Sequence, residues 1–77
     1  MSKPVFFHAG CPVCTSAEHD IIQIIGDDKV EVVHLGENRN RIEEAEKLGV
    51  KSVPALVTPN GHVLHINFGA SIADVKG

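Results

Sequence analysis

The chain has 77 residues, a length that suits one domain near the lower limit for a self-sufficient hydrophobic core. Hydrophobic residues make up 43% and charged residues 22%, and the formal net charge of −3 argues against a nucleic-acid-binding surface. Apolar runs stay well below the roughly 18 residues of a membrane span, so we expect no transmembrane segment. We therefore expect a single domain over residues 1–77.

The first segment, residues 1–4, leads directly into a β-branched and aromatic run without the hydrophobic region of a signal peptide, so we expect a cytoplasmic protein. Residues 5–8 predict a buried strand, and Ala9-Gly10 predicts a turn. Residues 12–25 predict a helix, because their apolar side chains recur on one side: Ala17, Ile21, Ile24 and Ile25.

Residues 26–28 end this helix, and the β-branched run over residues 29–35 predicts a second strand, parallel to the first through a right-handed crossover. A second helix is expected to begin at Glu37 or Asn38 and to continue to about Leu48. Gly49 suits the end of that helix.

Val53-Pro54 introduces a third predicted strand over residues 55–58, and the Asn-Gly pair within residues 59–62 predicts a hairpin. Residues 63–68 form the fourth predicted strand, antiparallel to the third. Gly69 is expected to break it before one or two helical turns over residues 70–75. Phe6, Phe7 and Phe68 are core candidates. The order is β-α-β-α-β-β-α, an α/β fold with a four-stranded mixed sheet flanked by helices.

Cys11-Pro12-Val13-Cys14 lies where the first strand meets the first helix. Two thiols three positions apart at a helix start lie within about one turn of each other. Free backbone N–H groups and the helix dipole favour a thiolate at Cys11, and Cys14 is close enough to form a disulfide with it. A disulfide that encloses so few residues adds little stability, so redox chemistry or metal binding is favoured over scaffolding.

The chain resembles the thioredoxin fold in its order of elements and in two motifs, Cys11-Pro12-Val13-Cys14 and Ser52-Val53-Pro54. Its length is most similar to that of a glutaredoxin or a small mini-thioredoxin. The resemblance covers essentially the whole chain. It implies Cys11 as the nucleophile, Cys14 as the resolving thiol and a cis peptide bond before Pro54. It also implies that the backbone of Val53 pairs with an extended substrate.

This resemblance implies a thiol-disulfide oxidoreductase that reduces protein disulfides or mixed disulfides. We expect a disulfide-bearing protein as substrate, a flavoprotein reductase or a low-molecular-weight thiol as electron donor, and a monomer. The residues expected to bind substrate are His8, Pro12, Val13, Val53, Pro54 and Gly69. Beyond the Cys11–Cys14 disulfide we expect no cofactor.

The chain differs from glutaredoxins at positions that hold glutathione: His8 stands where a Lys or Arg is common, and Gly69-Ala70-Ser71 replaces a Gly-Gly and acidic pair. Glutathione is therefore one option for the thiol donor rather than the expected ligand. A protonated His8 would favour the Cys11 thiolate and contact an acidic substrate. The alternative is a polar residue that closes the strand.

The principal alternative function is a soft-metal carrier, because His8, Cys11 and Cys14 supply three ligands suited to Cu(I) or Zn(II). Small copper chaperones also place Cys-x-x-Cys between a first strand and a first helix. Their element order is β-α-β-β-α-β, however, and Ala9 stands where they usually carry Met. A binding module with a degenerate redox site is a third possibility, less favoured because both cysteines are present.

Overall fold

The computed structural model describes residues 3–76, apart from the side chains of Asn67 and Phe68. The sequence-based core assignment of Phe68 lies outside the described side chains. The elements follow one another as β1 Val5–His8, α1 Pro12–Ile25, β2 Glu31–His34, the 3-10 helix η1 Arg39–Arg41, α2 Ile42–Leu48, β3 Ser52–Val57, β4 Val63–Ser71 and α3 Ile72–Lys76. The predicted element order is confirmed.

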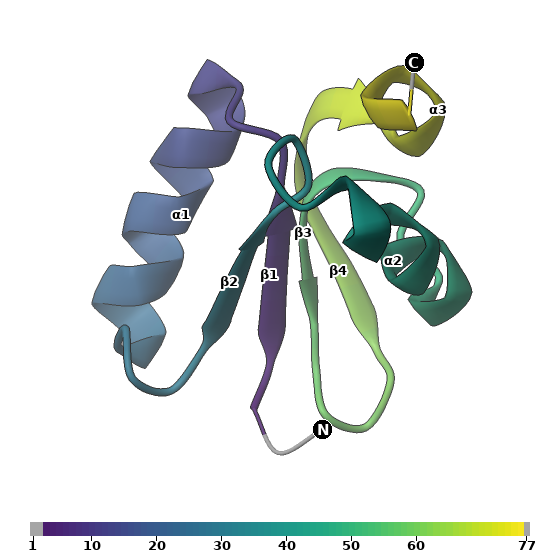
Figure 1. The fold of residues 1–77 in the computed structure, drawn as a ribbon. Helices are drawn as coiled ribbons and strands as arrows, with labels where there is room; N and C mark the ends of the chain where they lie inside the picture. Colours follow the sequence, from purple (N-terminus) through teal and green to yellow (C-terminus); the bar gives the residue numbers. More distant parts are fainter. Residues whose placement is uncertain (1–2, 77) are drawn as a thin grey trace.

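The four strands form one mixed sheet in the order β2-β1-β3-β4 (Figure 1). β1 and β2 are parallel, with His8 opposite His34, whereas β1–β3 and β3–β4 are antiparallel. The helix between β1 and β2 makes this parallel pairing possible, because parallel neighbours need a long crossover connection. Both predicted pairings are confirmed.

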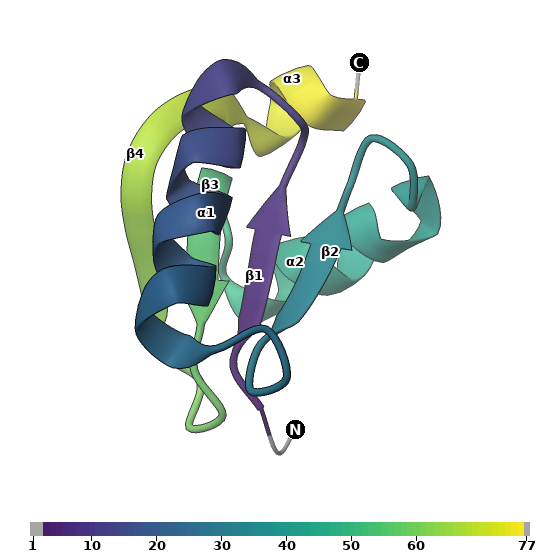
Figure 2. The ribbon, with the colours of Figure 1, turned by 90° about the vertical axis from the view of Figure 1, so that its left-hand side faces the viewer.

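Helix α1 covers one face of the sheet, and α2 and α3 lie on the other side (Figures 1 and 2). Beneath α1 a small buried cluster joins the sheet to the helix: Phe6, Ala17, Val30 and Leu56. The larger cluster contains Phe7, Val33, Val57, Ile42 and Ala45 from strands and α2, together with Ile72 and Val75 of α3. Alternation along β1 explains this division, because Phe6 and Phe7 point to opposite faces. Both rings are fully buried, as predicted.

Several boundaries differ from the predicted ones. β2 covers only Glu31–His34, and the second helix begins with the tighter turn η1 before α2. β3 begins at Ser52, before Pro54, because Ser52 and Val53 already pair with β4. The predicted break at Gly69 is wrong: β4 continues to Ser71, with Ser71 opposite Ser52 and an irregular register in between.

Among the described residues no helix has the length and apolarity that a membrane span requires.

Candidate active site

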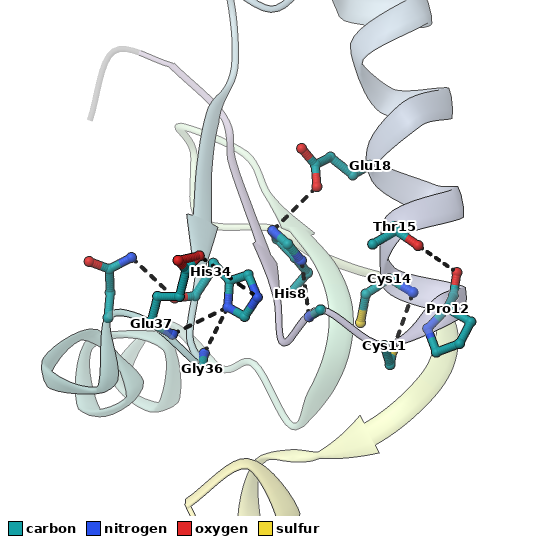
Figure 3. A network of polar contacts seen from close by, with 11 residues as sticks. His8, Cys11, Pro12, Cys14, Thr15, Glu18, His34, Gly36 and Glu37 are labelled. Carbon is teal, nitrogen blue, oxygen red and sulfur yellow. Dashed lines mark hydrogen bonds and ion pairs between the residues drawn. The ribbon is translucent and has the colours of Figure 1, made fainter.

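The two cysteines lie where β1 hands the chain to α1 (Figure 3). Gly10 turns the backbone between β1 and Cys11. Its φ of 81° is a conformation that favours glycine. Cys11 is the N-cap of α1, and Pro12 occupies the first turn, where a missing N–H leaves no hydrogen bond unmade. The predicted strand–turn–helix setting of the motif is confirmed.

The sulfur of Cys11 takes the place of the usual capping oxygen. The backbone N–H of Cys14 donates to Cys11 Sγ at 3.2 Å, as the dashed line in Figure 3 shows. A capping atom accepts an N–H that has no partner inside the helix, and here that atom is a thiol sulfur. A negative charge on this sulfur would be stabilised by the same N–H and by the helix dipole. Cys11 remains partly exposed to solvent.

Cys14 occupies the opposite environment. It is fully buried and packs in the larger core cluster, together with Val53 and Leu35. Burial raises the pKa of the Cys14 thiol, because removal from water disfavours the thiolate. Both cysteines are free thiols in this structure. The site therefore combines one accessible sulfur with one that is protonated and enclosed.

Gly69 of the edge strand β4 lies directly against the two cysteines. A Cβ placed on Gly69 would overlap Cys11 Sγ and would lie 3.3 Å from Cys14 Sγ and 3.1 Å from the Val53 carbonyl oxygen. Both sulfurs therefore lie near one point in space, the Cβ position of residue 69. A side chain at position 69 would therefore force Cys11 Sγ or β4 to shift.

The Val53–Pro54 peptide bond is cis, as the resemblance implied. Val53 is opposite Ala70 of β4, and both Val53 and Pro54 are fully buried. Of the residues expected to bind substrate, Pro12, Val13 and Gly69 are at least partly accessible, whereas His8, Val53 and Pro54 are not. A substrate that reaches the Val53 backbone would have to displace the atoms that cover it.

His8 has its polar partners inside the protein. The N–H of Gly10 donates to Nδ1 at 3.2 Å, and Nε2 lies 3.4 Å from Glu18 Oε1 (Figure 3). Burial lowers the pKa of His8 from 6.5, and Glu18 only partly opposes this shift, so the ring is neutral near pH 7. The cationic role considered for His8 is therefore not supported, and the alternative of a polar residue closing the strand agrees with its contacts.

His34 is the neighbour that sequence reasoning did not connect with the site. Its Nδ1 accepts the N–H groups of Gly36 and Glu37, and its ring centroid lies 4.7 Å from that of His8. A Cβ on Gly10 would come within 2.6 Å of His34 Nε2, so the ring fills the space behind the cysteine turn. The only available signal was the parallel pairing that sets His34 opposite His8.

The three-ligand metal set is not assembled. Among residues 3–76 as described, no group of three His, Cys, Asp or Glu side chains is arranged to hold a metal ion. The reason lies in His8, because Gly10 and Glu18 occupy its two nitrogens. His8, Cys11 and Cys14 are thus not brought together as the three-ligand set that the soft-metal alternative predicted.

Comparisons with protein-family models and with curated proteins found no match. Among solved structures, the chain is similar to a dimeric thioredoxin-like protein from Nitrosomonas europea, determined by solution NMR. The two share 60% sequence identity and superpose with a TM-score of 0.86, over 99% of this chain and 96% of the other. Sequence identity of this extent, together with the sheet order and the placement of the two cysteines, shows that the chain belongs to the thioredoxin-like family.

Proposed function

We propose that this protein is a thiol-disulfide oxidoreductase that reduces protein disulfides or mixed disulfides through Cys11 and Cys14. The observation that carries the proposal is the asymmetry of the two sulfurs. Cys11 is partly exposed and its Sγ accepts a helix N–H at 3.2 Å, whereas Cys14 is fully buried beside it. Membership of the thioredoxin-like family supports a redox role in the same direction.

In the proposed reaction the Cys11 thiolate attacks one sulfur of a substrate disulfide. A bond forms between Cys11 and that sulfur, the substrate S–S bond breaks, and the other substrate sulfur leaves as a thiolate. Cys14 then loses its proton and attacks Cys11 Sγ, which releases the second substrate thiol. Two electrons pass to the substrate, and the protein is left with a Cys11–Cys14 disulfide.

The cycle is completed by a flavoprotein reductase or a low-molecular-weight thiol that returns two electrons to this disulfide. Glutathione is one such thiol. Pro12 and Val13 follow Cys11 in α1, and Gly69 approaches its sulfur. All three residues are at least partly exposed, so we assign them to the first contact with substrate. We place this reaction in a reducing compartment such as the cytoplasm, where disulfides are transient and catalytic rather than structural.

Two substitutions test the proposal. We expect Cys11→Ser to abolish reduction of a disulfide-bearing protein such as insulin, because the remaining cysteine, Cys14, is fully buried. We expect Cys14→Ser to accumulate a mixed disulfide through Cys11, which mass spectrometry of the intact adduct would detect. Turnover retained by Cys11→Ser, or no adduct with Cys14→Ser, would contradict the assigned roles.

We also propose that the protein is a homodimer rather than the monomer expected from sequence. The support is the similar protein from Nitrosomonas europea, which is described as dimeric and is 60% identical. Sedimentation velocity over a range of concentrations would test this, with a mass of twice 8.3 kDa as the expected result.

A further inference from the structure

The two edges of the sheet differ in how well they are protected against pairing with another strand. β2, at one edge, has four residues, and its Glu31 carboxylate forms an ion pair with Arg41 at 2.6 Å. β4, at the other edge, has nine residues, none of them Lys, Arg, Asp, Glu or Pro. Short length, charge and proline are the usual means by which proteins block edge pairing. β4 uses none of them.

We propose that two copies of this protein associate by antiparallel pairing of the outer edges of their β4 strands. The inference deepens the homodimer proposed above and rests on it. It names the surface through which that dimer forms.

Large apolar side chains accompany this edge. Leu64 is 58% exposed and Ile66 is 37% exposed, both on β4, and Ile24 of α1 is 79% exposed. Helical spacing places Ile24 on the flank of α1 opposite Glu18, which reaches His8 on β1. Helix α1 itself packs against β4, beside it in Figure 2. We call Leu64, Ile66 and Ile24, with the outer backbone of β4, the β4 surface.

The backbone of β4 has groups free to pair at this surface. The Thr58 N–H donates to the His62 carbonyl at 2.8 Å, which identifies residues 58 and 62 as a hydrogen-bonded pair. Such pairs alternate along an antiparallel ladder with pairs whose N–H and C=O groups point away. With Leu56 opposite Leu64 in the same register, Val63 and His65 turn their N–H and C=O groups to the outer edge.

A second copy of the chain fits the β4 surface better than a charged partner does. Each copy carries a net charge of −3, so two copies meet most favourably through a surface without charges. A two-fold axis would bring the same strand edge and the same apolar side chains together from both copies. Edge pairing alone buries little area, and the side chains of the β4 surface extend it toward the ~600 Å² per partner that a stable interface needs.

The proposed contact leaves the cysteines accessible. Val63 and His65 lie at the hairpin end of β4, whereas Gly69, which contacts both sulfurs, lies near its other end. Dimer formation and disulfide reduction are therefore separable. A monomeric variant is expected to keep its turnover.

Leu64→Lys tests the surface, because the symmetric contact would bring two like charges together without partners. We expect sedimentation equilibrium to show the dimer dissociation constant raised about 100-fold or more. Val32→Lys is the matched control, since Val32 is an exposed apolar residue on the other edge strand, 36% exposed. It is expected to leave the dimer unchanged. Circular dichroism would establish that both variants fold.

Amide hydrogen exchange measured by NMR on the wild-type protein gives a second test that needs no variant. We expect the Val63 and His65 amides to be protected at high concentration and to exchange faster on dilution, whereas the inward Leu64 amide stays protected throughout. A wild-type protein that stays monomeric would overturn the dimer itself. A dimer that persists in Leu64→Lys, or that dissociates in Val32→Lys, would show that the β4 surface is not the dimer interface. The proposal that the protein is a dimer would still stand. The insulin assay on Leu64→Lys reports on the redox proposal independently of both.

Discussion

The outer and inner halves of the cysteine site are built from different kinds of structure. The outer half is a helix start: Cys11 caps α1, its sulfur accepts the Cys14 N–H, and Pro12 beside it is exposed. The inner half belongs to the core: Cys14 is fully buried, and the neighbouring Val53 and Pro54 are as well. Cys11 therefore lies in a polar, electropositive environment, whereas Cys14, three positions later, lies in an apolar one.

This difference gives the proposed reaction its order. A sulfur held by backbone donors at the surface can meet a substrate disulfide, whereas a buried thiol whose pKa is raised is protected from outside disulfides. The buried thiol then needs only a short movement to reach the mixed disulfide, because both sulfurs approach the same point above Gly69. Burial of Cys14 thus limits side reactions without separating the pair.

The largest effect on this arrangement is expected from Gly69→Ala. The new Cβ would overlap Cys11 Sγ and crowd the Val53 carbonyl, so the sulfur must move by about an ångström or β4 must shift. A displacement of that size in a reacting group lowers turnover by about 100-fold. The insulin assay and the rate of alkylation of Cys11 would measure it.

Gly61→Ala is the matched control for stability. Gly61 has a φ of 89° and open space around its Cβ position, so alanine there introduces backbone strain of about 1–2 kcal/mol far from the sulfurs. We expect it to lower the free energy of unfolding while turnover stays near wild type. If Gly69→Ala lost no more activity than Gly61→Ala, close packing at the sulfurs would have no bearing on function.

Gly69 also shows where reasoning from sequence succeeded and where it could not. Hydrophobic periodicity predicted the order of strands and helices, because each element buries one side. The spacing of its apolar residues indicates which side is buried and whether the element is a strand or a helix. The end of β4 was predicted wrongly, since glycine commonly interrupts strands. Here its small size is needed for contact with Cys11, and the strand continues to pair through Ser71. Sequence alone does not distinguish these two uses of glycine.

His8 and His34 illustrate a second limit. A histidine three positions before Cys11 invites a role as a cation, but its charge depends on burial and on partners that come from other elements. Glu18 approaches from α1 and His34 from β2, and their positions follow from helix packing and strand register. The proximity of the two cysteines, by contrast, depends on local chain geometry, so the motif itself was sufficient to predict it.

The resolving step is expected to depend on pH in a way that reports on the inner half of the site. Because burial raises the pKa of Cys14, its thiolate fraction, and hence the rate of attack on the mixed disulfide, rises about tenfold per pH unit below that pKa. Stopped-flow measurement of substrate release from a preformed mixed disulfide would follow it. A rate that levels off below the ordinary thiol pKa would show that Cys14 is not held in an apolar environment during the reaction.

The smallest expected effect concerns His8 and the stability of the fold. Burial lowers the pKa of folded His8 below 6.5, so the unfolded chain takes up a proton first as the pH falls. The stability that neutral His8 contributes is present above pH 6.5 and is lost as the pH falls through the lower, folded pKa. His8→Gln removes this titration while keeping a polar side chain that can accept from Gly10. Urea unfolding between about pH 7.5 and pH 5 should therefore show a steeper loss of stability in the wild type than in His8→Gln. Parallel curves for the two proteins would mean that His8 titrates alike in the folded and unfolded chains, and that its neutral state is not imposed by the core behind the cysteines.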